Sequence, residues 1–255
     1  MNSSDALFLI SKYAHRFFFL RFLGLLCLLF GFSPVKAEWH GELRFTSNYV
    51  YRGYSKSQGN PVAQGLIDYQ HNSGWFGGLG LSQVTIDNPS NLDHAEVESK
   101  PYAGWVLPLS ANWRAELTAS GYLYNGKVFG QDADYAELGA TLNYKDWLSG
   151  KISVAPNAYQ RHTTVSSYEL NYRRDILDTL QFSAGLGYTQ SWALIDQDYF
   201  YWNLGASWFL TSYLTLDARY VDAYLNDYDE SEFHVNDFDP SPLGNKYLLS
   251  ITLGF

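Results

Sequence analysis

The sequence is poor in reactive and charged residue types. It holds one cysteine (Cys27), one methionine and six histidines, and 17% of its residues are charged. Cys27 lies in a segment that we expect to be removed, so the remaining chain would have no disulfide, thiolate metal site or cysteine nucleophile. Acidic residues outnumber basic ones by 26 to 17. This balance argues against a nucleic-acid partner, because phosphate binding needs a basic surface. An aromatic content of 18% excludes a disordered chain.

The N-terminus has the pattern of a secretory signal peptide. Three basic residues precede an uncharged apolar run at 22–32. That run is shorter than the roughly 20 residues a membrane-spanning helix needs. A Ser-Pro pair and the small residue Ala37 follow it. We therefore predict a signal peptide at 1–37, cleaved after Ala37, and a single domain at 38–255. No later stretch approaches 18 apolar residues, so this domain is either soluble and exported or spans a membrane as a closed sheet.

The rest of the chain repeats one pattern, in which about ten residues alternate apolar with polar or small side chains before a turn. From Leu180 to Tyr188, for example, every second residue is apolar. A period of two is typical of strands with one apolar face. We predict an all-β fold, a transmembrane antiparallel up-and-down β-barrel of about 12 strands. The predicted strands are 39–51, 62–70, 75–84, 94–107, 112–124, 134–144, 148–155, 165–173, 178–188, 198–209, 213–222 and 245–255.

Short and long connections alternate along the predicted strands, and the aromatic residues follow them. Connections of three or four residues, such as 71–74 and 174–177, alternate with polar connections of about ten residues or more. Outer-membrane barrels have short turns in the periplasm and long loops outside. Two belts of amphipathic rings are expected at the lipid–water boundaries. The belt at the short turns would hold Trp39, Trp75, Trp105, Trp113, Trp147 and Trp208. The belt at the long loops would hold Tyr49, Tyr51, Tyr122, Tyr124, Tyr135, Tyr188, Tyr199, Tyr201 and Tyr220.

The last ten residues carry the sharpest local pattern. Apolar side chains occupy every second position and end on a terminal aromatic: Tyr247, Leu249, Ile251, Leu253 and Phe255. This strand resembles the C-terminal assembly signal of outer-membrane proteins. The resemblance implies recognition by the barrel-assembly machinery and by periplasmic chaperones, with outer-membrane lipid as the final environment. The expected location is the outer membrane of a Gram-negative bacterium.

Residues 46–55, with the sequence TSNYVYRGYS, are the most specific motif. Pro61, Gln64-Gly65 and the segment SGWFGG at 73–78 follow it. Together they resemble the opening of the TorF family of bacterial outer-membrane proteins, which are described as porins. The resemblance extends over most of 38–255, but the motif residue Pro is replaced by Asn125 after the Tyr-x-Tyr run. It implies a porin and supplies neither a substrate nor catalytic residues.

If the apolar positions face outward, the ionisable residues of the other parity face the lumen. The candidate pore-lining residues are Glu42, Arg44, Arg52, Glu96, Glu98, Lys100, Arg114, Glu116, Glu137, Asp217, Arg219 and Lys246. Asp68, Lys151, Glu169 and Arg173 have the same parity. Two interpretations remain open: a charged lumen that orients a polar solute, or a lattice of cross-strand ion pairs that fills the interior. The excess of acidic residues predicts a preference for cations.

Two lumen placements follow from these boundaries. Arg114 and Glu116 should face Glu96–Lys100 across one hairpin. Arg52 should share a strand and an inward face with Arg44, near the outer mouth, where it would stay solvated. There it would guard a pore or anchor loops or headgroups.

The function that fits best is passive diffusion of small polar solutes or ions through a porin. The alternative is a non-conducting barrel that acts as an anchor, adhesin or receptor through its loops. An outer-membrane phospholipase would need Ser and His held together on the outer face, whereas His71 and Ser73 lie in a predicted periplasmic turn. We therefore expect no enzyme, no cofactor and no metal site, and treat the acidic loop Asp227–Asp239 as solvated.

Overall fold

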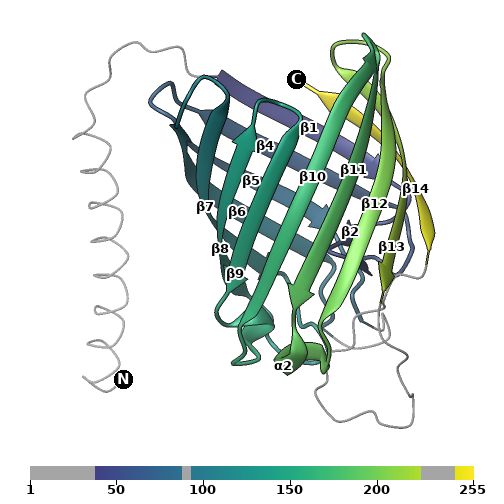
Figure 1. Cartoon of the computed structure of the whole chain (residues 1–255). Helices are drawn as coiled ribbons and strands as arrows, with labels where there is room; N and C mark the ends of the chain where they lie inside the picture. Colours follow the sequence, from purple (N-terminus) through teal and green to yellow (C-terminus); the bar gives the residue numbers. More distant parts are fainter. Residues whose placement is uncertain (1–37, 88–92, 225–244) are drawn as a thin grey trace, which may run out of the picture. The chain divides into compact units, whose positions relative to one another are not determined.

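The computed structural model describes residues 38–87, 93–224 and 245–255. The predicted signal peptide and the acidic loop Asp227–Asp239 lie outside these residues. Twelve strands form one closed sheet (Figure 1). They are β1 (Glu38–Thr46), β4 (Val62–Gln70), β5 (Trp75–Gln83), β6 (Val97–Pro108), β7 (Trp113–Tyr124), β8 (Tyr135–Tyr144), β9 (Leu148–Ala155), β10 (Val165–Leu177), β11 (Leu180–Gln190), β12 (Tyr199–Phe209), β13 (Leu214–Tyr224) and β14 (Lys246–Gly254).

The sheet closes because its first and last strands pair. Every barrel strand is antiparallel to its neighbours, and β1 pairs with both β4 and β14. At the seam, Glu42 lies opposite Gly254 and Thr46 opposite Ser250. The predicted twelve-stranded up-and-down barrel is confirmed. Closure leaves no edge strand with unpaired backbone groups, which is what allows a sheet to cross a membrane.

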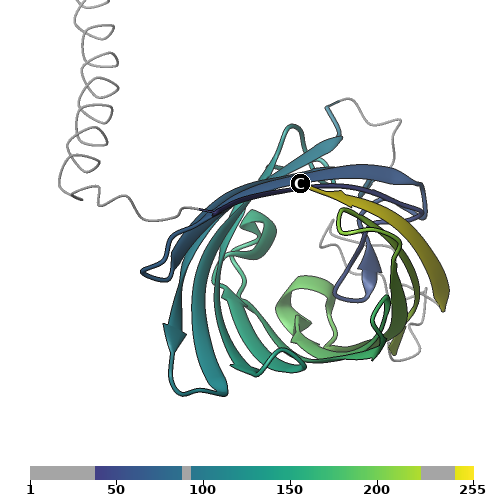
Figure 2. The ribbon, with the colours of Figure 1, turned by 90° about the horizontal axis from the view of Figure 1, so that it is seen from above.

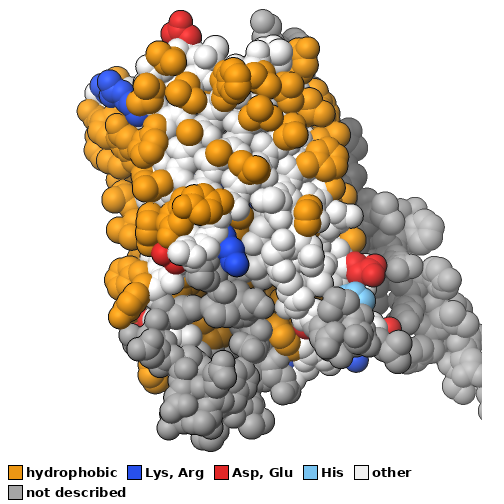
Figure 3. Space-filling model, turned by 90° about the vertical axis from the view of Figure 1, so that its right-hand side faces the viewer, with side chains coloured by type: hydrophobic (Ala, Val, Ile, Leu, Met, Phe, Trp, Pro, Cys, Tyr) orange, Lys and Arg blue, Asp and Glu red, His pale blue; other side chains and the backbone are white. Residues whose placement is uncertain are grey.

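Alternation along each strand separates an apolar outer face from a polar interior. On β8, Leu138 is 61% exposed while its neighbour Glu137 is 4% exposed. On β9, Ile152 is 51% exposed and Ser153 is buried. Hydrophobic side chains cover the outside of the barrel wall (Figure 3). An exposed apolar surface of this extent is stable only against lipid.

Among the described residues, no helix is both long enough and apolar enough to cross a membrane. Helical structure in this part of the chain is confined to η1 (Ala158–Gln160) and α2 (Trp192–Ile195), each within a long loop.

Short turns and long loops lie at opposite ends of the barrel, as predicted (Figure 1). The shortest turn, between β10 and β11, is only residues 178–179. The sequence predicted a longer turn at 174–177, which is wrong: those residues belong to β10. A register shift between Asp175 and Leu177 absorbs the extra residue, so the strand continues through a bulge.

The belt at the short turns is present, but the tyrosine belt at the loops is largely absent. Five tryptophans of the first belt are exposed on the outer face: Trp39, Trp75, Trp105, Trp113 and Trp208. At the loop end, Tyr122, Tyr135 and Tyr199 are instead buried. Their side chains point into the barrel. Tyr135, for example, lies two residues from the inward Glu137 on β8 and therefore faces the same side. Tyr188 packs on the outward Phe200, with ring centroids 4.6 Å apart, and fits the predicted position.

The predicted first strand, 39–51, is the main error of the sequence interpretation. β1 ends at Thr46, whose hydroxyl donates to the Asn48 carbonyl at 3.1 Å. The chain then enters the barrel and forms a separate two-stranded hairpin of β2 (Val50–Tyr51) and β3 (Tyr54–Ser55). Seen along the barrel, this hairpin lies inside the ring of strands (Figure 2). We call residues 47–61 the inner hairpin loop.

The start of β6 also differs from the prediction. The strand begins at Val97, not at residue 94. The backbone amides of Glu96 and Val97 both donate to the Asn125 side-chain oxygen at 2.9 Å. That side chain takes the place of a strand partner, so the ladder begins one residue beyond Glu96.

Candidate functional site in the barrel interior

The inner hairpin loop is fixed by a buried ion pair. The Lys56 ammonium donates to Glu98 on β6, and both residues are almost fully buried, at 0% and 1% exposed. The Glu98 carboxylate also accepts from the Tyr49 and Tyr124 hydroxyls, each at 2.8 Å. Burial lowers the pKa of Lys56, but the charge and hydrogen bond of Glu98, together with the nearby Tyr159 and Tyr122, outweigh it, and the pKa lies above its ordinary value of 10.5. Lys56 is therefore charged throughout the neutral range.

A second buried cation, Arg52, joins the hairpin turn to three strands of the barrel wall. Its guanidinium contacts Glu137 at 2.6 and 2.9 Å, Glu169 at 3.0 Å and the Ser153 hydroxyl at 2.7 Å. The side chain is 10% exposed. Arg52 is thus neither solvated nor on the strand of Arg44, and both predictions were wrong. Its loss would leave two carboxylates unpaired.

The hairpin turn needs its Arg-Gly pair. Arg52 and Gly53 both have positive φ, 47° and 83°, as a type I′ turn requires at its two central positions. A Cβ added to Gly53 would lie 2.8 Å from Tyr201 Cβ and 3.1 Å from Ala223 Cβ. The turn therefore packs closely against side chains of β12 and β13. From that position the Arg52 side chain reaches β8, β9 and β10, on the side of the barrel opposite β1.

Tyrosines surround the two buried cations. Lys56 Nζ lies 4.2 Å from the Tyr51 ring centroid and 5.0 Å from that of Tyr122. The Tyr51 and Tyr122 hydroxyls are 3.1 Å apart, and Tyr122 stacks on Tyr135 with centroids separated by 4.5 Å. These aromatic rings stabilise the cations and exclude water from the ion pairs. The largest hydrophobic cluster of the described chain includes this region, at the loop end of the barrel.

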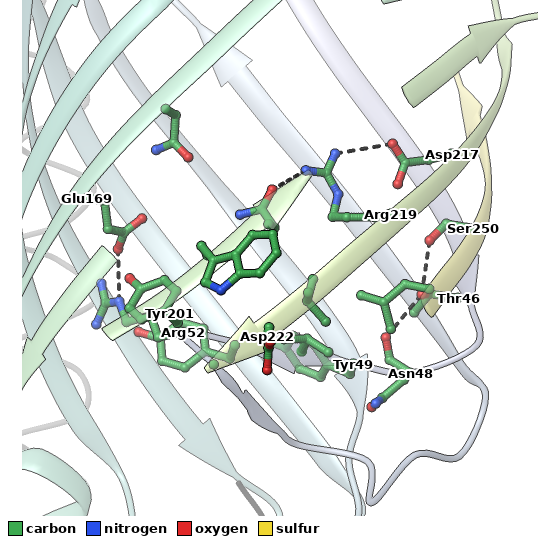
Figure 4. Close-up of a pocket in the computed structure, with 18 of the residues that line it drawn as sticks. Thr46, Asn48, Tyr49, Arg52, Glu169, Tyr201, Asp217, Arg219, Asp222 and Ser250 are labelled. Carbon is green, nitrogen blue, oxygen red and sulfur yellow. Dashed lines mark hydrogen bonds and ion pairs between the residues drawn. The ribbon is translucent and has the colours of Figure 1, made fainter. Parts of the chain in front are cut away.

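A polar cavity of about 430 Å³ lies beside the inner hairpin loop (Figure 4). Its wall includes Arg52 and Glu169 on one side and the Arg219–Asp217 pair on the other (Figure 4). Lys100 and Lys151 also line it. Amide and hydroxyl side chains also contribute to the lining, beside apolar and aromatic ones: Thr46, Asn48, Gln64, Asn171, Asn203 and Ser250.

A second polar cavity, of about 340 Å³, lies toward the short turns. Asn171, Asn203 and Arg219 line both cavities. The Arg219 guanidinium donates to Asn203 at 2.5 Å, to the Ser183 hydroxyl at 3.1 Å and to Asp217 at 3.2 Å. The Arg219 network therefore lies at the boundary between the two cavities. Polar groups therefore line the interior from the hairpin to the short-turn end.

The other predicted lumen residues are distributed along the barrel. Arg44 contacts Glu42 at 3.1 Å, as their spacing of two suggested. Arg114 pairs instead with Asp146 in a short turn at 3.1 Å. It lies opposite Pro108, and Glu116 lies opposite Val106. The prediction that Arg114 and Glu116 face Glu96–Lys100 is therefore wrong, because Lys100 lies farther along β6.

The remaining candidates lie at the ends of strands. Glu96 precedes β6, and its side chain is 70% exposed beside His94 at 3.7 Å. Lys246 is exposed at the start of β14. Of the predicted assembly signal, Tyr247, Leu249, Ile251, Leu253 and Phe255 are all exposed on the outer face. Phe255 closes the seam, because its backbone amide and carbonyl both bond to Gly41, at 2.9 and 2.7 Å. Its role in assembly stays a prediction.

Sequence reasoning missed Lys56 and undervalued two other residues. Lys56 lies in a loop, where a cation is usually solvated, and no local pattern indicates that the loop turns inward. Lys151 and Glu169 have inward parity but were not selected as pore-lining candidates. Parity also placed Tyr122 and Tyr124 on the face of Glu116. Following the alternation, rather than the belt rule, would have identified the inner tyrosines.

His71 and Ser73 do come together, in the exposed turn between β4 and β5. The His71 Nδ1 and Ser73 Oγ atoms are 2.7 Å apart, and the Ser73 amide donates to the same nitrogen at 3.2 Å. The imidazole stacks on Trp75, with centroids 5.2 Å apart. This is the geometry of a side chain that stabilises a turn. Within the described residues, no group of three or more His, Asp or Glu side chains is placed to hold a metal ion.

A closed twelve-stranded barrel with an apolar outer face and a polar interior defines a membrane-spanning β-barrel of the outer-membrane type. The chain belongs to the family described as "Bacterial protein of unknown function (Gcw_chp)", whose pattern matches residues 33–245. The search of curated proteins gave no match.

Two solved structures show the same fold at low sequence identity. One is the KdgM porin in complex with disordered oligogalacturonate, at 9% identity and a TM-score of 0.51, covering 86% of this chain and 99% of that chain. The other is the NanC porin, at 10% identity and a TM-score of 0.51, covering 84% of this chain and 98% of that chain. The chain therefore shares the barrel fold of porins.

Proposed function

We propose that this protein is an outer-membrane porin that passes small polar solutes or ions passively, narrowed from the loop side by its inner hairpin loop. The observation that carries the proposal is the pair of polar cavities in the barrel interior, which share Arg219, Asn171 and Asn203 as lining residues. A barrel serving only as scaffold has no need of a polar space through its interior. Barrels of eight strands are filled by side chains and those of 16–18 hold a channel, and twelve strands leave room for a narrow one.

The chemistry of the lining suits hydrated solutes. Amides, hydroxyls and charged groups line the cavity, so a solute can exchange water for side-chain hydrogen bonds there. The KdgM and NanC structures, both of porins, support the same assignment by fold. The motif at 46–55 supports a closer place among TorF porins, because its Arg-Gly pair forms the turn of the inner hairpin loop. The outward apolar β14 supports delivery by periplasmic chaperones and insertion by the barrel-assembly machinery.

One observation favours the alternative, a non-conducting barrel that acts through its loops. Lys56 and Arg52 fix the hairpin inside the barrel by buried ion pairs, and a hairpin held this firmly could close the lumen. In either case the proposal assigns no catalytic role to His71 and Ser73, which lie in an exposed turn.

Conductance across a planar lipid bilayer separates the two functions. The purified protein, shown to be folded by heat-modifiable gel migration, should give discrete open levels if it is a channel. A folded barrel that stays silent at all voltages would support the anchor or receptor instead. Release of fatty acid from the bilayer would contradict both.

A further inference from the structure

The cavity beside the inner hairpin loop presents positive charge, although the whole chain is acidic. Three carboxylates line it, and each already accepts a hydrogen bond. Glu169 accepts from Arg52 at 3.0 Å and Asp217 from Arg219 at 3.2 Å. Asp222 accepts from the Tyr220 hydroxyl at 3.1 Å. The negative charges of the cavity are thus either paired or hydrogen-bonded.

The two lysines of the cavity are different. Lys100 on β6 and Lys151 on β9 are half-buried and line the cavity. Among the described residues, neither has a carboxylate oxygen within 4.0 Å or a side-chain hydrogen bond. The Tyr122 ring centroid lies 5.1 Å from the Lys100 Nζ. An ammonium group has three donors, so these two side chains offer unused donors to the cavity.

The inner hairpin loop produces this imbalance. Glu98 lies two residues before Lys100 on β6, and Glu137 lies on β8, the strand next to the β9 of Lys151, so both carboxylates could have neutralised the lysines. The hairpin cations Lys56 and Arg52 bind these carboxylates instead. Glu98 and Glu137 are buried, at 1% and 4% exposed respectively. A solute in the cavity therefore meets the two lysines, which line it, whereas Glu98 and Glu137 do not line it and are paired with the hairpin cations.

We propose that Lys100 and Lys151 form a binding site for small anionic solutes, in particular carboxylates, and that the lumen favours anions. This inference rests on the proposed channel and reverses the cation preference expected from net charge. A carboxylate would accept from the ammonium groups, while its hydroxyl or water neighbours bond to the amide and hydroxyl lining. The volume of about 430 Å³ lies within the range of small-molecule sites.

The test measures reversal potential in planar bilayers under a KCl gradient, and again with potassium gluconate replacing KCl on one side. Swelling of liposomes in sorbitol, a neutral solute of similar size, reports whether the pore is open. The variants are Lys100→Gln, Lys151→Gln and the double variant, which keep a polar, unbranched side chain and remove the charge. Lys127→Gln removes the same charge from an exposed loop and serves as the matched control.

The wild-type protein should favour chloride over potassium and should carry gluconate current. The anion-to-cation permeability ratio of the double variant should be about tenfold lower than that of wild type. Each single variant should have an intermediate ratio, and the control should match wild type. Sorbitol swelling should persist in all of them. A cation-selective wild type, or an unchanged ratio in the double variant, would overturn the inference while leaving the channel intact. Absence of both current and sorbitol swelling in folded protein would overturn the channel, and this inference with it.

Discussion

Replacing Lys56 by methionine tests whether the buried ion pair holds the hairpin in the lumen. Methionine is an unbranched side chain of similar length without the charge, so Glu98 would lose its counter-charge while staying buried at 1% exposure. Removing one partner of a buried pair typically costs about 3–5 kcal/mol. The hydroxyls of Tyr49 and Tyr124 would still donate to the carboxylate at 2.8 Å, which places the cost near the lower end, about 3 kcal/mol.

Loss of the ion pair should destabilise the seated hairpin more than the barrel. The strands are held by their own ladders, whereas the hairpin can leave the lumen and return Glu98 to water. A shift of about 3 kcal/mol changes the ratio of seated to released hairpin by roughly a hundredfold. The expected result is a higher mean conductance with larger open levels. The urea midpoint of the barrel should shift by less than the full loss of about 3 kcal/mol would produce.

The double variant Lys56→Met with Glu98→Gln is the control, because it leaves no unpaired buried charge. It should recover most of the wild-type conductance. If Lys56→Met alone matched wild type in both conductance and urea midpoint, the ion pair would not be what seats the hairpin.

Three further predictions address the turn, the pH response and the seam. Gly53→Ala should raise conductance, because its φ of 83° disfavours a side chain and the added Cβ would lie 2.8 Å from Tyr201 Cβ. Gly59→Ala is the control: its φ is 79° but no atom lies within 4 Å of the added Cβ, so conductance should not change. Equal effects of the two variants would contradict the role of the Gly53–Tyr201 contact. Since the pKa of Lys56 is raised, its contribution is complete below the ordinary value of 10.5 and is lost only as pH rises through the raised pKa. Conductance should thus be flat across neutral pH, and an opening near neutrality would argue against the pair. Phe255→Ala should reduce the fraction of folded, heat-modifiable protein in outer membranes. The reduction should be larger than that caused by alanine at a lipid-facing position of β14. Equal fractions for the two variants would contradict a special role of Phe255 in assembly.

The alternation of side chains was sufficient to predict the fold. Leu138 outward beside Glu137 inward, repeated over twelve strands, defines a barrel without knowledge of any contact. The Glu42–Arg44 contact followed from spacing alone. Register across strands did not follow, because it depends on turn geometry and bulges such as that at Asp175. This is why Arg114 was assigned the wrong partners.

The inner hairpin loop cannot be predicted from the sequence, for a physical reason. Tyr49, Val50 and Tyr51 continue the period of two from β1, so nothing local ends the strand at Thr46. The hairpin folds inward because Lys56 and Arg52 find carboxylates on β6, β8 and β10, far away in the chain. Those contacts are tertiary, and no single-sequence pattern contains them.

The most direct test of the account compares single-channel conductance before and after removal of the hairpin. Residues 50–55 would be replaced by a short Gly-Ser linker, and folding would be verified by heat-modifiable migration of both proteins. The wild-type barrel should show small discrete open levels, and the hairpin-deleted barrel should show larger ones with weaker anion preference. Two folded barrels that both remain silent would contradict the claim that this interior is a channel narrowed by its own hairpin.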